Sequence, residues 1–345
     1  MWTRKWFIVL STVLAFSMLL LGCAGPAGQP AVKAPTELKI ALVLETAVES
    51  PWNTAFLQSL ERVQQEKPHG LTISYDMTES VAMADAERVL RQYADSGKYQ
   101  IIWAHSGFSD AVNVLKKQYP NLLWVVTGAG NDPVGENAYW IDAYLHEPSY
   151  LMGVIAGKMT KTNVLGVVAA YPFPNVNIQV NGFIEGAKSV NPNVDVKVTY
   201  IESWFDPPKA KESALAQIAA GADFILAERF GVFDAAKEKG IFAFGSQVDQ
   251  YDVAPEVVLT SAVIRFDPAL KYIIEEWWNH ETQGKAYNAP TQAVIYFMKD
   301  GGSDIAPFHG NESKISKEAL EAVQQAKAKI MDGSLKVPVN PAKPE

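Results

Sequence analysis

Two hydrophobic patterns alternate along most of this chain. Short continuous apolar runs, such as residues 122–126, are typical of parallel strands that are buried on both faces. Longer stretches place apolar side chains three or four residues apart, as Ala55, Phe56, Leu60 and Val63 do, and this is the spacing of an amphipathic helix. The expected strands are 39–44, 71–75, 100–105, 122–127, 164–170, 195–201, 224–226 and 242–244, and the expected helices are 52–66, 82–95, 111–118, 149–159, 177–189, 208–220, 233–239 and 315–331.

The alternation itself indicates the fold class. Strands that alternate with helices predict doubly wound α/β layers, and the pattern runs twice, once on each side of Tyr144. We therefore expect two similar lobes joined by a hinge. The N-terminal lobe is expected over residues 37–144 and about 265–300, and the C-terminal lobe over residues 145–264 and about 301–340.

The first 22 residues read as an export signal. Arg4 and Lys5 precede an apolar stretch over residues 6–21, which falls short of the ~20 residues that span a bilayer. The sequence Leu-Leu-Gly-Cys ending at Cys23 resembles a bacterial lipobox, which implies cleavage before Cys23 and lipidation of its thiol. A plain signal peptide with an incidental cysteine is the alternative. Residues 23–36, rich in Ala, Pro and Gly, suit a tether between the lipid and the folded body.

The net charge and the cysteine count exclude several classes of partner and site. The chain has 345 residues, with 30 Lys and Arg against 38 Asp and Glu, so its net charge is −8. An acidic chain argues against nucleic acid, because phosphate binding draws most of its affinity from basic residues. The single cysteine excludes a disulfide scaffold and cysteine-rich zinc sites. We expect a monomer held at a membrane by a lipid.

Catalytic signatures are missing from the sequence. There is no Gly-x-Ser-x-Gly and no His-Glu-x-x-His motif, and the glycines around Gly153 and Gly157 lack the spacing of a phosphate loop. Of the five histidines only His105, at a strand end, is placed to line a cleft, and we interpret it as structural. We expect no enzyme activity, no cofactor and no metal.

The segments that follow the strand ends are the expected binding site, because ligands of doubly wound sheets lie outside the carboxyl ends of the strands. These segments are unusually aromatic. Rings on loops, together with nearby amides and carboxylates, fit a flat heteroaromatic ligand, whereas the alternative is that the rings pack within their own lobe. The rings are Trp52, Phe108, Tyr171, Phe173, Trp204, Phe205 and Phe230.

Several long motifs carry a family resemblance. The clearest are Glu-Pro-Ser-Tyr-Leu-Met-Gly-Val-Ile-Ala-Gly-Lys over residues 147–158, Asn-Gly-Phe-Ile-Glu-Gly-Ala-Lys over 181–188 and Phe-Asp-Ala-Ala-Lys-Glu-Lys-Gly over 233–240. The chain resembles the basic membrane protein family of ABC-transporter substrate-binding lipoproteins. The resemblance implies a type I periplasmic binding protein, similar to ribose-binding protein, that delivers purine nucleosides or bases to a membrane permease.

The resemblance also implies a set of site residues. A motif with a stacking ring and an amide matches residues 49–53, and a second motif with the opposite ring matches residues 203–207. Nucleoside binders in the family carry an Asp for the ribose where this chain has Gln247, and a Lys where it has Ile264, so a free base such as adenine or hypoxanthine is favoured. The predicted ligand-binding residues are Glu49, Trp52, Asn53, Phe108, Asp110, Phe173, Trp204, Phe205, Asp206, Arg229, Gln247 and Asp249.

The expected mechanism is hinge closure. Crossovers near residues 143–147, 262–266 and 296–302 would let the lobes close on a ligand that contacts both of them. Arg229, if it faces the cleft, favours a carbonyl-bearing or anionic ligand, unless it pairs with Glu228 or with solvent. Two alternatives stay open: a receptor for a nucleoside, sugar or other small polar metabolite, and a surface interaction lipoprotein.

Overall fold

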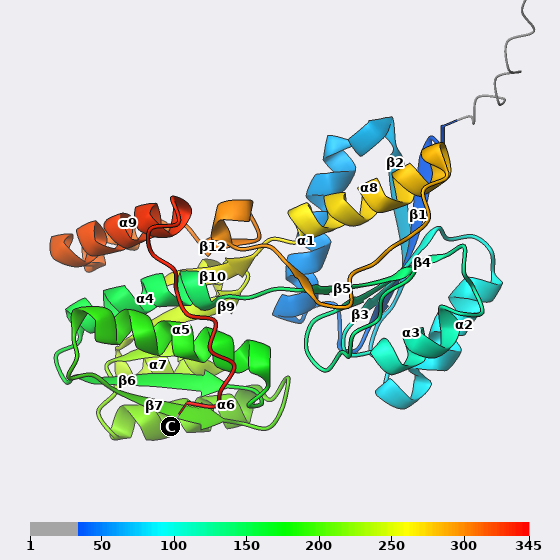
Figure 1. Ribbon diagram of the computed structural model, residues 1–345. Helices are drawn as coiled ribbons and strands as arrows, with labels where there is room; N and C mark the ends of the chain where they lie inside the picture. The colour runs from blue at the N-terminus through cyan, green and yellow to red at the C-terminus, as the bar shows by residue number, and fades with distance from the viewer. Residues whose placement is uncertain (1–33, 345) are drawn as a thin grey trace, which may run out of the picture. The chain divides into compact units, whose positions relative to one another are not determined.

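The computed structural model describes residues 34–344. The predicted export signal, Cys23 and most of the predicted tether lie outside the described residues. Two six-stranded sheets organise the chain, each flanked by helices on both faces (Figure 1). The expected doubly wound α/β class with two lobes is therefore confirmed.

The first sheet belongs to the N-terminal lobe. Its strands are parallel in the order β11-β5-β4-β3-β1-β2. They span β1 Glu37–Leu44, β2 Thr72–Thr78, β3 Ile101–His105, β4 Leu123–Thr127, β5 Ala138–Asp142 and β11 Val294–Ile295. The helices α1 (Pro51–Glu66) and α8 (Asp267–Gln283) cover one face, and α2 (Ala86–Asp95) and α3 (Ser109–Leu115) cover the other.

The second sheet belongs to the C-terminal lobe and has the order β12-β10-β9-β8-β6-β7. Its strands are β6 Val164–Ala169, β7 Asp195–Tyr200, β8 Phe224–Ala227, β9 Phe242–Gln247, β10 Val258–Ile264 and β12 Ser303–Ile305, of which β12 alone pairs antiparallel. The helices α4 (His146–Met159) and α5 (Pro174–Val190) cover one face, with α9 (Lys317–Met331) against α4, and α6 (Pro207–Ala219) and α7 (Val232–Lys239) cover the other.

Local sequence explains where these elements begin and end. Helix α1 starts with Pro51, which lacks the amide hydrogen that a first helical turn leaves unbonded, and it ends at Lys67 in a left-handed conformation. Helix α9 starts two residues later than expected, because the Ser316 side chain accepts a hydrogen bond from the Ala319 amide and caps the helix. Short 3₁₀ turns lie at Pro68–Gly70, Met83–Asp85, Tyr251–Val253, Met298–Asp300 and Asn311–Lys314.

Glycines bring α4 and α5 into close contact. A methyl group on Gly153 would lie 2.1 Å from the Phe183 carbonyl oxygen, and one on Gly186 would lie 2.0 Å from the Tyr150 carbonyl oxygen. The glycines near Gly153, which do not form a phosphate loop, are thus needed for the two backbones to approach each other.

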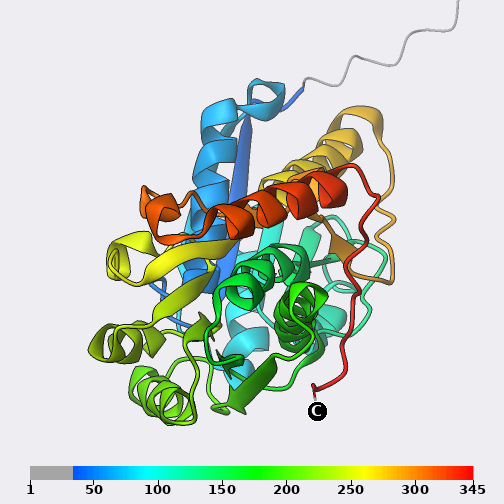
Figure 2. The ribbon, with the colours of Figure 1, turned by 90° about the vertical axis from the view of Figure 1, so that its left-hand side faces the viewer.

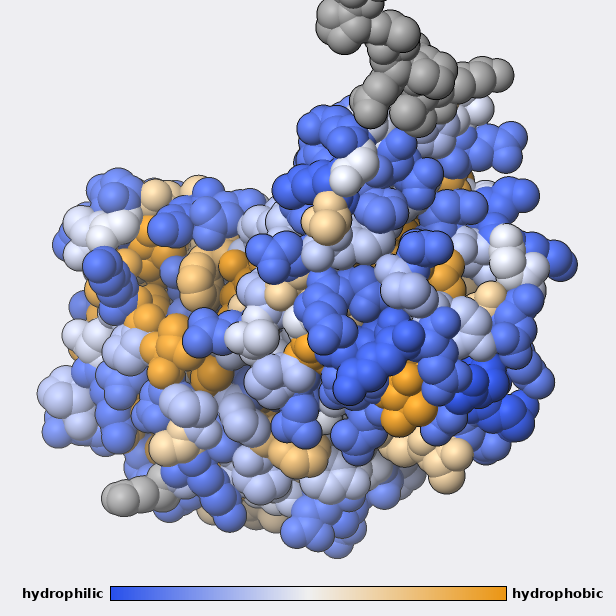
Figure 3. Space-filling view, turned by 45° about the vertical axis from the view of Figure 1, so that its right-hand side comes forward, coloured by the Kyte–Doolittle hydropathy of each residue, from blue (hydrophilic) through white to orange (hydrophobic). Residues whose placement is uncertain are grey.

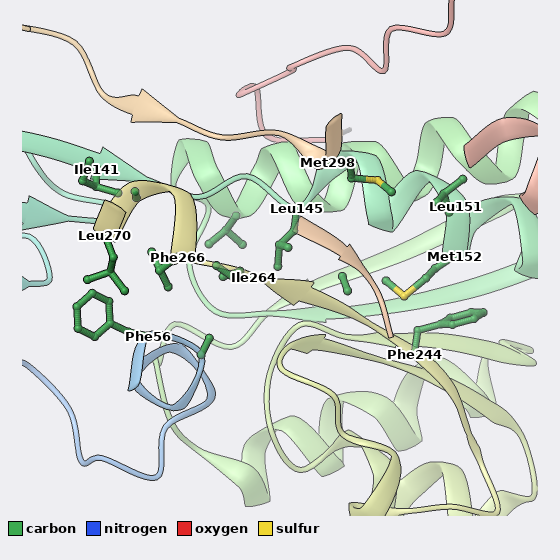
Figure 4. Packing of buried hydrophobic residues seen from close by; sticks show 14 of the residues in the cluster. Phe56, Ile141, Leu145, Leu151, Met152, Phe244, Ile264, Phe266, Leu270 and Met298 are labelled. Carbon is green, nitrogen blue, oxygen red and sulfur yellow. The ribbon is translucent and has the colours of Figure 1, made fainter. Parts of the chain in front are cut away.

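Three connections join the two sheets: residues 143–145 after β5, residues 265–266 after β10, and residues 296–302 between β11 and β12. One cluster of buried apolar side chains runs along these connections from Phe56 and Leu270 through Phe266 and Ile264 to Phe244 (Figure 4). The bidentate ion pair of Arg62 with Asp267, at 2.6 and 2.7 Å, anchors the start of α8 to α1. The connections are therefore packed rather than loose.

Apolar residues are unevenly distributed over the surface of the protein. In the view of Figure 3 apolar surface gathers toward the left, whereas the right-hand part is mostly hydrophilic. Figure 2 shows α9 from another side, with the chain after it descending over the green helices of the C-terminal lobe. Among residues 34–344 no helix is both long enough and apolar enough to cross a membrane.

Candidate ligand-binding site between the lobes

A cavity of about 260 Å³ lies where the carboxyl ends of strands from both sheets face each other. The N-terminal lobe lines it with residues at and after the ends of β1, β3 and β4. The C-terminal lobe lines it with the segments after β6, β7 and β8, with the last residues of β9 and β10, and with the first turns of α5. This is the place where doubly wound sheets bind ligands. The cavity is thus the candidate site.

Trp52 forms part of the wall contributed by the N-terminal lobe. Its ring lies almost parallel to that of His105, with centroids 5.2 Å apart and planes at 21°, and meets Phe266 edge-on at 5.3 Å. A methyl group on Gly128 would lie 2.9 Å from the Trp52 ring, so the indole packs directly on the backbone there. These contacts hold the ring in one orientation at the cavity.

His105, at the end of β3, stacks on Trp52 and also lines the cavity. Its side chain is fully buried, and burial lowers the pKa of the imidazole to about 3. Neither ring nitrogen has a hydrogen-bond partner within residues 34–344. The ring is therefore neutral, and it acts as an aromatic platform.

Asn53 presents a hydrogen-bond acceptor at the same wall. Its Nδ2 atom donates to the Thr46 carbonyl oxygen, to Thr46 Oγ1 and to the Ala47 carbonyl oxygen at 2.8–3.1 Å, which holds the loop after β1 in place. Its Oδ1 atom is buried and has no partner among the described residues. A buried acceptor without a partner costs stability, so a ligand N–H group would satisfy it.

The wall contributed by the C-terminal lobe is an aromatic cluster. Trp204 lies 5.0 Å from Tyr171 and 5.7 Å from Phe173, measured between ring centroids. Phe205, 59% exposed, stacks at 6.2 Å on Phe230 at the rim. Phe173 and the Arg229 guanidinium both pack against the Trp204 ring. A ligand that contacts Trp204 would therefore lie next to these two side chains.

Glu228 and Arg229 form a buried ion pair at the end of β8. Arg229 Nε donates to Glu228 Oε2 at 2.9 Å, Nη2 donates to Oε1, and Nη1 donates to the Trp204 carbonyl oxygen at 3.0 Å. Glu228 Oε2 also accepts from the Ala170 amide at 2.9 Å. Burial raises the pKa of Glu228, while the neighbouring guanidinium opposes that shift. The predicted alternative, in which Arg229 pairs with Glu228, is what the structure has.

Gln247 and Ile264 both line the cavity. Gln247 ends β9 with φ at +73°, a left-handed conformation, and Ile264 ends β10 and is buried. The two positions at which the family resemblance implies an Asp and a Lys in nucleoside binders thus have uncharged side chains at the cavity.

Five of the predicted residues do not line the cavity. Glu49 is exposed on the surface of the N-terminal lobe, and Asp110 is exposed in the first turn of α3. Phe108, 1% exposed, packs in the core between the sheet and α2 and α3. Asp206 caps α6 by accepting from the Lys209 amide at 3.0 Å, and Asp249 pairs with His309 at 2.6 Å. Capping, an ion pair and core packing account for Asp206, Asp249 and Phe108, whereas Glu49 and Asp110 are exposed.

The sequence reasoning missed other residues that line the cavity. Glu45, which accepts a hydrogen bond from Ser106 Oγ, directly follows the predicted strand 39–44 but has no aromatic ring to mark it as a candidate. Gly128 directly follows the predicted strand 122–127, but a glycine has no side chain by which the sequence could mark it. Gln179, bonded to Ser246 Oγ at 2.9 Å, comes from inside α5, where no signal in the sequence identifies it.

Comparison with known proteins identifies the family. The sequence profile described as "ABC transporter substrate-binding protein PnrA-like" matches residues 38–340, nearly the whole described chain. The chain belongs to this family. The resemblance to basic membrane proteins is thereby confirmed, and the family role is that of a substrate-binding component of ABC transporters.

The names of the relatives of this PnrA-like protein refer to different ligands. A purine-binding protein of Brucella abortus is 30% identical over 75% of this chain and 71% of its own length. A protein of Haloferax volcanii, provisionally named as a glucose-binding ABC transporter protein, is 31% identical over 83% of this chain and 70% of its own length. A solute-binding protein of Aeropyrum pernix has a similar fold, with a TM-score of 0.71, 18% identity and coverage of 87% and 94% of the two chains.

Proposed function

We propose that this PnrA-like protein binds a purine, with a free base favoured over a nucleoside, in the cavity between its lobes and delivers it to an ABC permease. The observation that carries the proposal is that aromatic rings from both lobes line one cavity whose two ribose-directed positions are uncharged. The name of the Brucella abortus relative supports a purine.

Stacking is the main interaction in this proposal. Trp52, stacked on His105, lines the cavity from the N-terminal lobe, while Phe173 and Trp204 supply rings from the opposite lobe. Each aromatic contact adds about 0.5–1.5 kcal/mol beyond the burial of apolar area. A planar purine ring between the two walls gains stacking free energy from rings of both lobes. A site formed by one lobe would supply rings on one side only.

The preference for a base over a nucleoside rests on Gln247 and Ile264. A ribose diol buried beside an amide and an alkyl group forfeits the charge-assisted hydrogen bonds that a carboxylate and an ammonium would supply. A base needs only stacking faces and a few groups at its edges, and Asn53 Oδ1 is one of them.

Closure of the hinge is the proposed response to the ligand. A purine held by rings of both lobes stabilises the closed form only through contacts that the open form lacks. The connections at residues 143–145, 265–266 and 296–302 would bend, and the closed form would present both lobes to the permease. We also propose that Cys23 carries a lipid anchor outside the cytoplasm, which mass analysis of the mature protein and a Cys23→Ser variant would test.

Calorimetry with a purine tests the stacking. Trp52→Ala and Trp204→Ala are each expected to weaken binding by about tenfold or more while the fold persists, because each removes a ring from one wall. Trp278→Ala is the matched control, since Trp278 stacks at 4.2 Å on His69 and does not line the cavity. Unchanged affinity in both cavity variants would remove the stacking proposal.

Mass spectrometry of ligand released from freshly purified, denatured protein tests the ligand class. A purine base among the released molecules is the expected result. Thermal-shift measurements with purine bases, nucleosides, pentoses and glucose provide the second arm. Stabilisation by glucose or a pentose alone would favour the sugar receptor, and no response to any small molecule would favour a surface interaction protein.

A further inference from the structure

The buried ion pair of Glu228 and Arg229 leaves some N–H donors of the guanidinium without an acceptor among the described residues. The guanidinium has five N–H groups. The pair with Glu228 and the bond to the Trp204 carbonyl use Nε–H, one N–H of Nη1 and one of Nη2. The other N–H on each of these two nitrogens has no acceptor in the part of the chain that the structure describes. Because the Arg229 side chain is only 10% exposed and lines the cavity, the cavity is where these donors can be satisfied.

The charge of Arg229 does not make this an anion site. The Glu228 carboxylate neutralises it directly, and Glu45 adds a second carboxylate to the cavity wall. Among the described residues that line the cavity, Arg229 is the only Lys or Arg. A ligand that carries a phosphate would therefore meet more negative than positive charge, whereas a neutral ligand with acceptor atoms finds free donors.

The opposite lobe contributes acceptor residues to the cavity wall. Asn53 Oδ1 is buried without a partner among residues 34–344, and Glu45 offers carboxylate oxygens that accept a single hydrogen bond from Ser106. The two lobes thus present unlike groups: the C-terminal lobe donates and the N-terminal lobe accepts. A ligand that suits both needs acceptors on one edge and N–H groups on another.

We propose, on the basis of the purine function above, that this arrangement selects 6-oxopurines over adenine. An arginine pairs with the adjacent O6 and N7 acceptors of a 6-oxopurine, as it does with guanine in DNA. The N1–H group of the same base would donate to Glu45 or Asn53. Adenine carries an amino donor in place of O6 and an acceptor at N1, so it opposes donor to donor at Arg229 and acceptor to acceptor at Glu45.

Calorimetry of the full chain with hypoxanthine and adenine tests this selectivity. Hypoxanthine is expected to bind about 10- to 100-fold more tightly, the discrimination of one bidentate arginine pair. The double variant Glu228→Gln with Arg229→Gln removes the guanidinium without leaving a buried charge unpaired, and it is expected to lose most of this ratio while adenine affinity changes little. Glu49→Gln is the control, since Glu49 is an exposed carboxylate outside the cavity.

The outcomes separate this inference from the function on which it rests. Adenine that binds as tightly as hypoxanthine, or more tightly, overturns the selectivity but leaves the purine function standing. Failure of both bases to bind overturns the purine function itself. Because the ratio is measured on the native protein, a double variant that does not fold leaves the test decisive.

Discussion

The cavity depends on a few residues whose positions are set by backbone contact. Trp52 is held between His105 and the Gly128 backbone, and Gly128 has φ at +90°, where a side chain is strained. The Gly128 carbonyl oxygen accepts from Trp140 Nε1 at 3.2 Å and from Asn131 Nδ2 at 2.9 Å, so this backbone cannot easily shift. The orientation of the stacking ring is therefore decided by a residue without a side chain.

Gly128→Ala is expected to weaken purine binding by tenfold or more. The new methyl group would lie 2.9 Å from the Trp52 ring and displace it, and the positive φ would cost about 1–2 kcal/mol of stability. Gly97→Ala is the matched control, because Gly97 has φ at +63° with nothing within 4 Å. Calorimetry and urea unfolding distinguish the two: the control loses stability only. Unaltered binding in Gly128→Ala would contradict this account of Trp52.

Helix packing in the C-terminal lobe depends on glycines at the crossing of α4 and α5. Gly186→Ala would ordinarily favour a helix by about 0.5–1 kcal/mol. Here we expect a loss of about 1–3 kcal/mol, because the methyl group would lie 2.0 Å from the Tyr150 carbonyl oxygen and force the helices apart. Urea unfolding measures the difference, with Glu185→Ala on the exposed side of α5 as the control. A more stable Gly186→Ala variant would show that the helices are not in close contact.

The chain after α9 forms a strap, residues 337–343, that crosses α5 (Figures 1 and 2). Asn181 Nδ2 donates to the carbonyl oxygens of Asn340 and Ala342, both at 2.8 Å. Asn177 Nδ2 donates to the Pro341 carbonyl oxygen at 2.9 Å and to that of Pro172 at 3.1 Å. The strap is thus linked through one amide to the loop that carries Phe173 into the cavity.

Truncation after Lys336 is expected to lower stability by about 1–3 kcal/mol and to weaken purine binding severalfold, because three amide hydrogen bonds are lost and the Phe173 loop loses its brace. Truncation after Ala342 keeps all three carbonyl oxygens and is the control. Thermal unfolding and calorimetry report the two effects. If both truncated proteins bind as the full chain does, the strap has no part in forming the site.

At the scale of the whole molecule, stability and pH are coupled at the connection between the lobes. Asp142 ends β5, and its carboxylate accepts a hydrogen bond from the Ala143 amide at 2.8 Å. Burial raises its pKa to about 7, against an ordinary value near 4. Between these values the folded protein holds a proton that the unfolded chain releases, so the contribution of Asp142 to stability falls as pH rises, by about 1.4 kcal/mol per pH unit.

Asp142→Asn is expected to be more stable than the native protein at pH 8 and to lose that advantage as the pH falls toward 4. Urea unfolding across this range measures the difference between the two proteins. His105 has the opposite sign, since its pKa is lowered to about 3 and its contribution is lost on acidification below pH 6.5, but it is common to both proteins and cancels. A difference that does not vary with pH would mean that Asp142 is ionised throughout.

The pattern of apolar and polar residues was enough to predict the layers of this protein and to point to the strand ends around the cavity. Continuous apolar runs such as 122–126 can be satisfied only by burial on both faces, so the alternating pattern was sufficient to predict doubly wound lobes. Helix α8 was nevertheless not among the expected elements, although Leu270, Ile273, Ile274 and Trp277 have helical spacing. The strand-end rule then located the cavity, because topology alone brings those ends together.

Which of the candidate side chains line the cavity depends on packing in three dimensions. Trp52 and Phe108 both follow strands and are equally aromatic, yet Trp52 lines the cavity while Phe108 packs inward. Asp206 and Arg229 are both charged side chains. Asp206 accepts a hydrogen bond from a helix amide, whereas Arg229 is buried beside Glu228 in an ion pair without net charge that leaves some of its donors free within the described part of the chain. Trp52 is directed by His105, which is distant in sequence and which a linear pattern does not bring to it, whereas Asp206 and Arg229 have partners within three residues whose contact forms only once the backbone is folded.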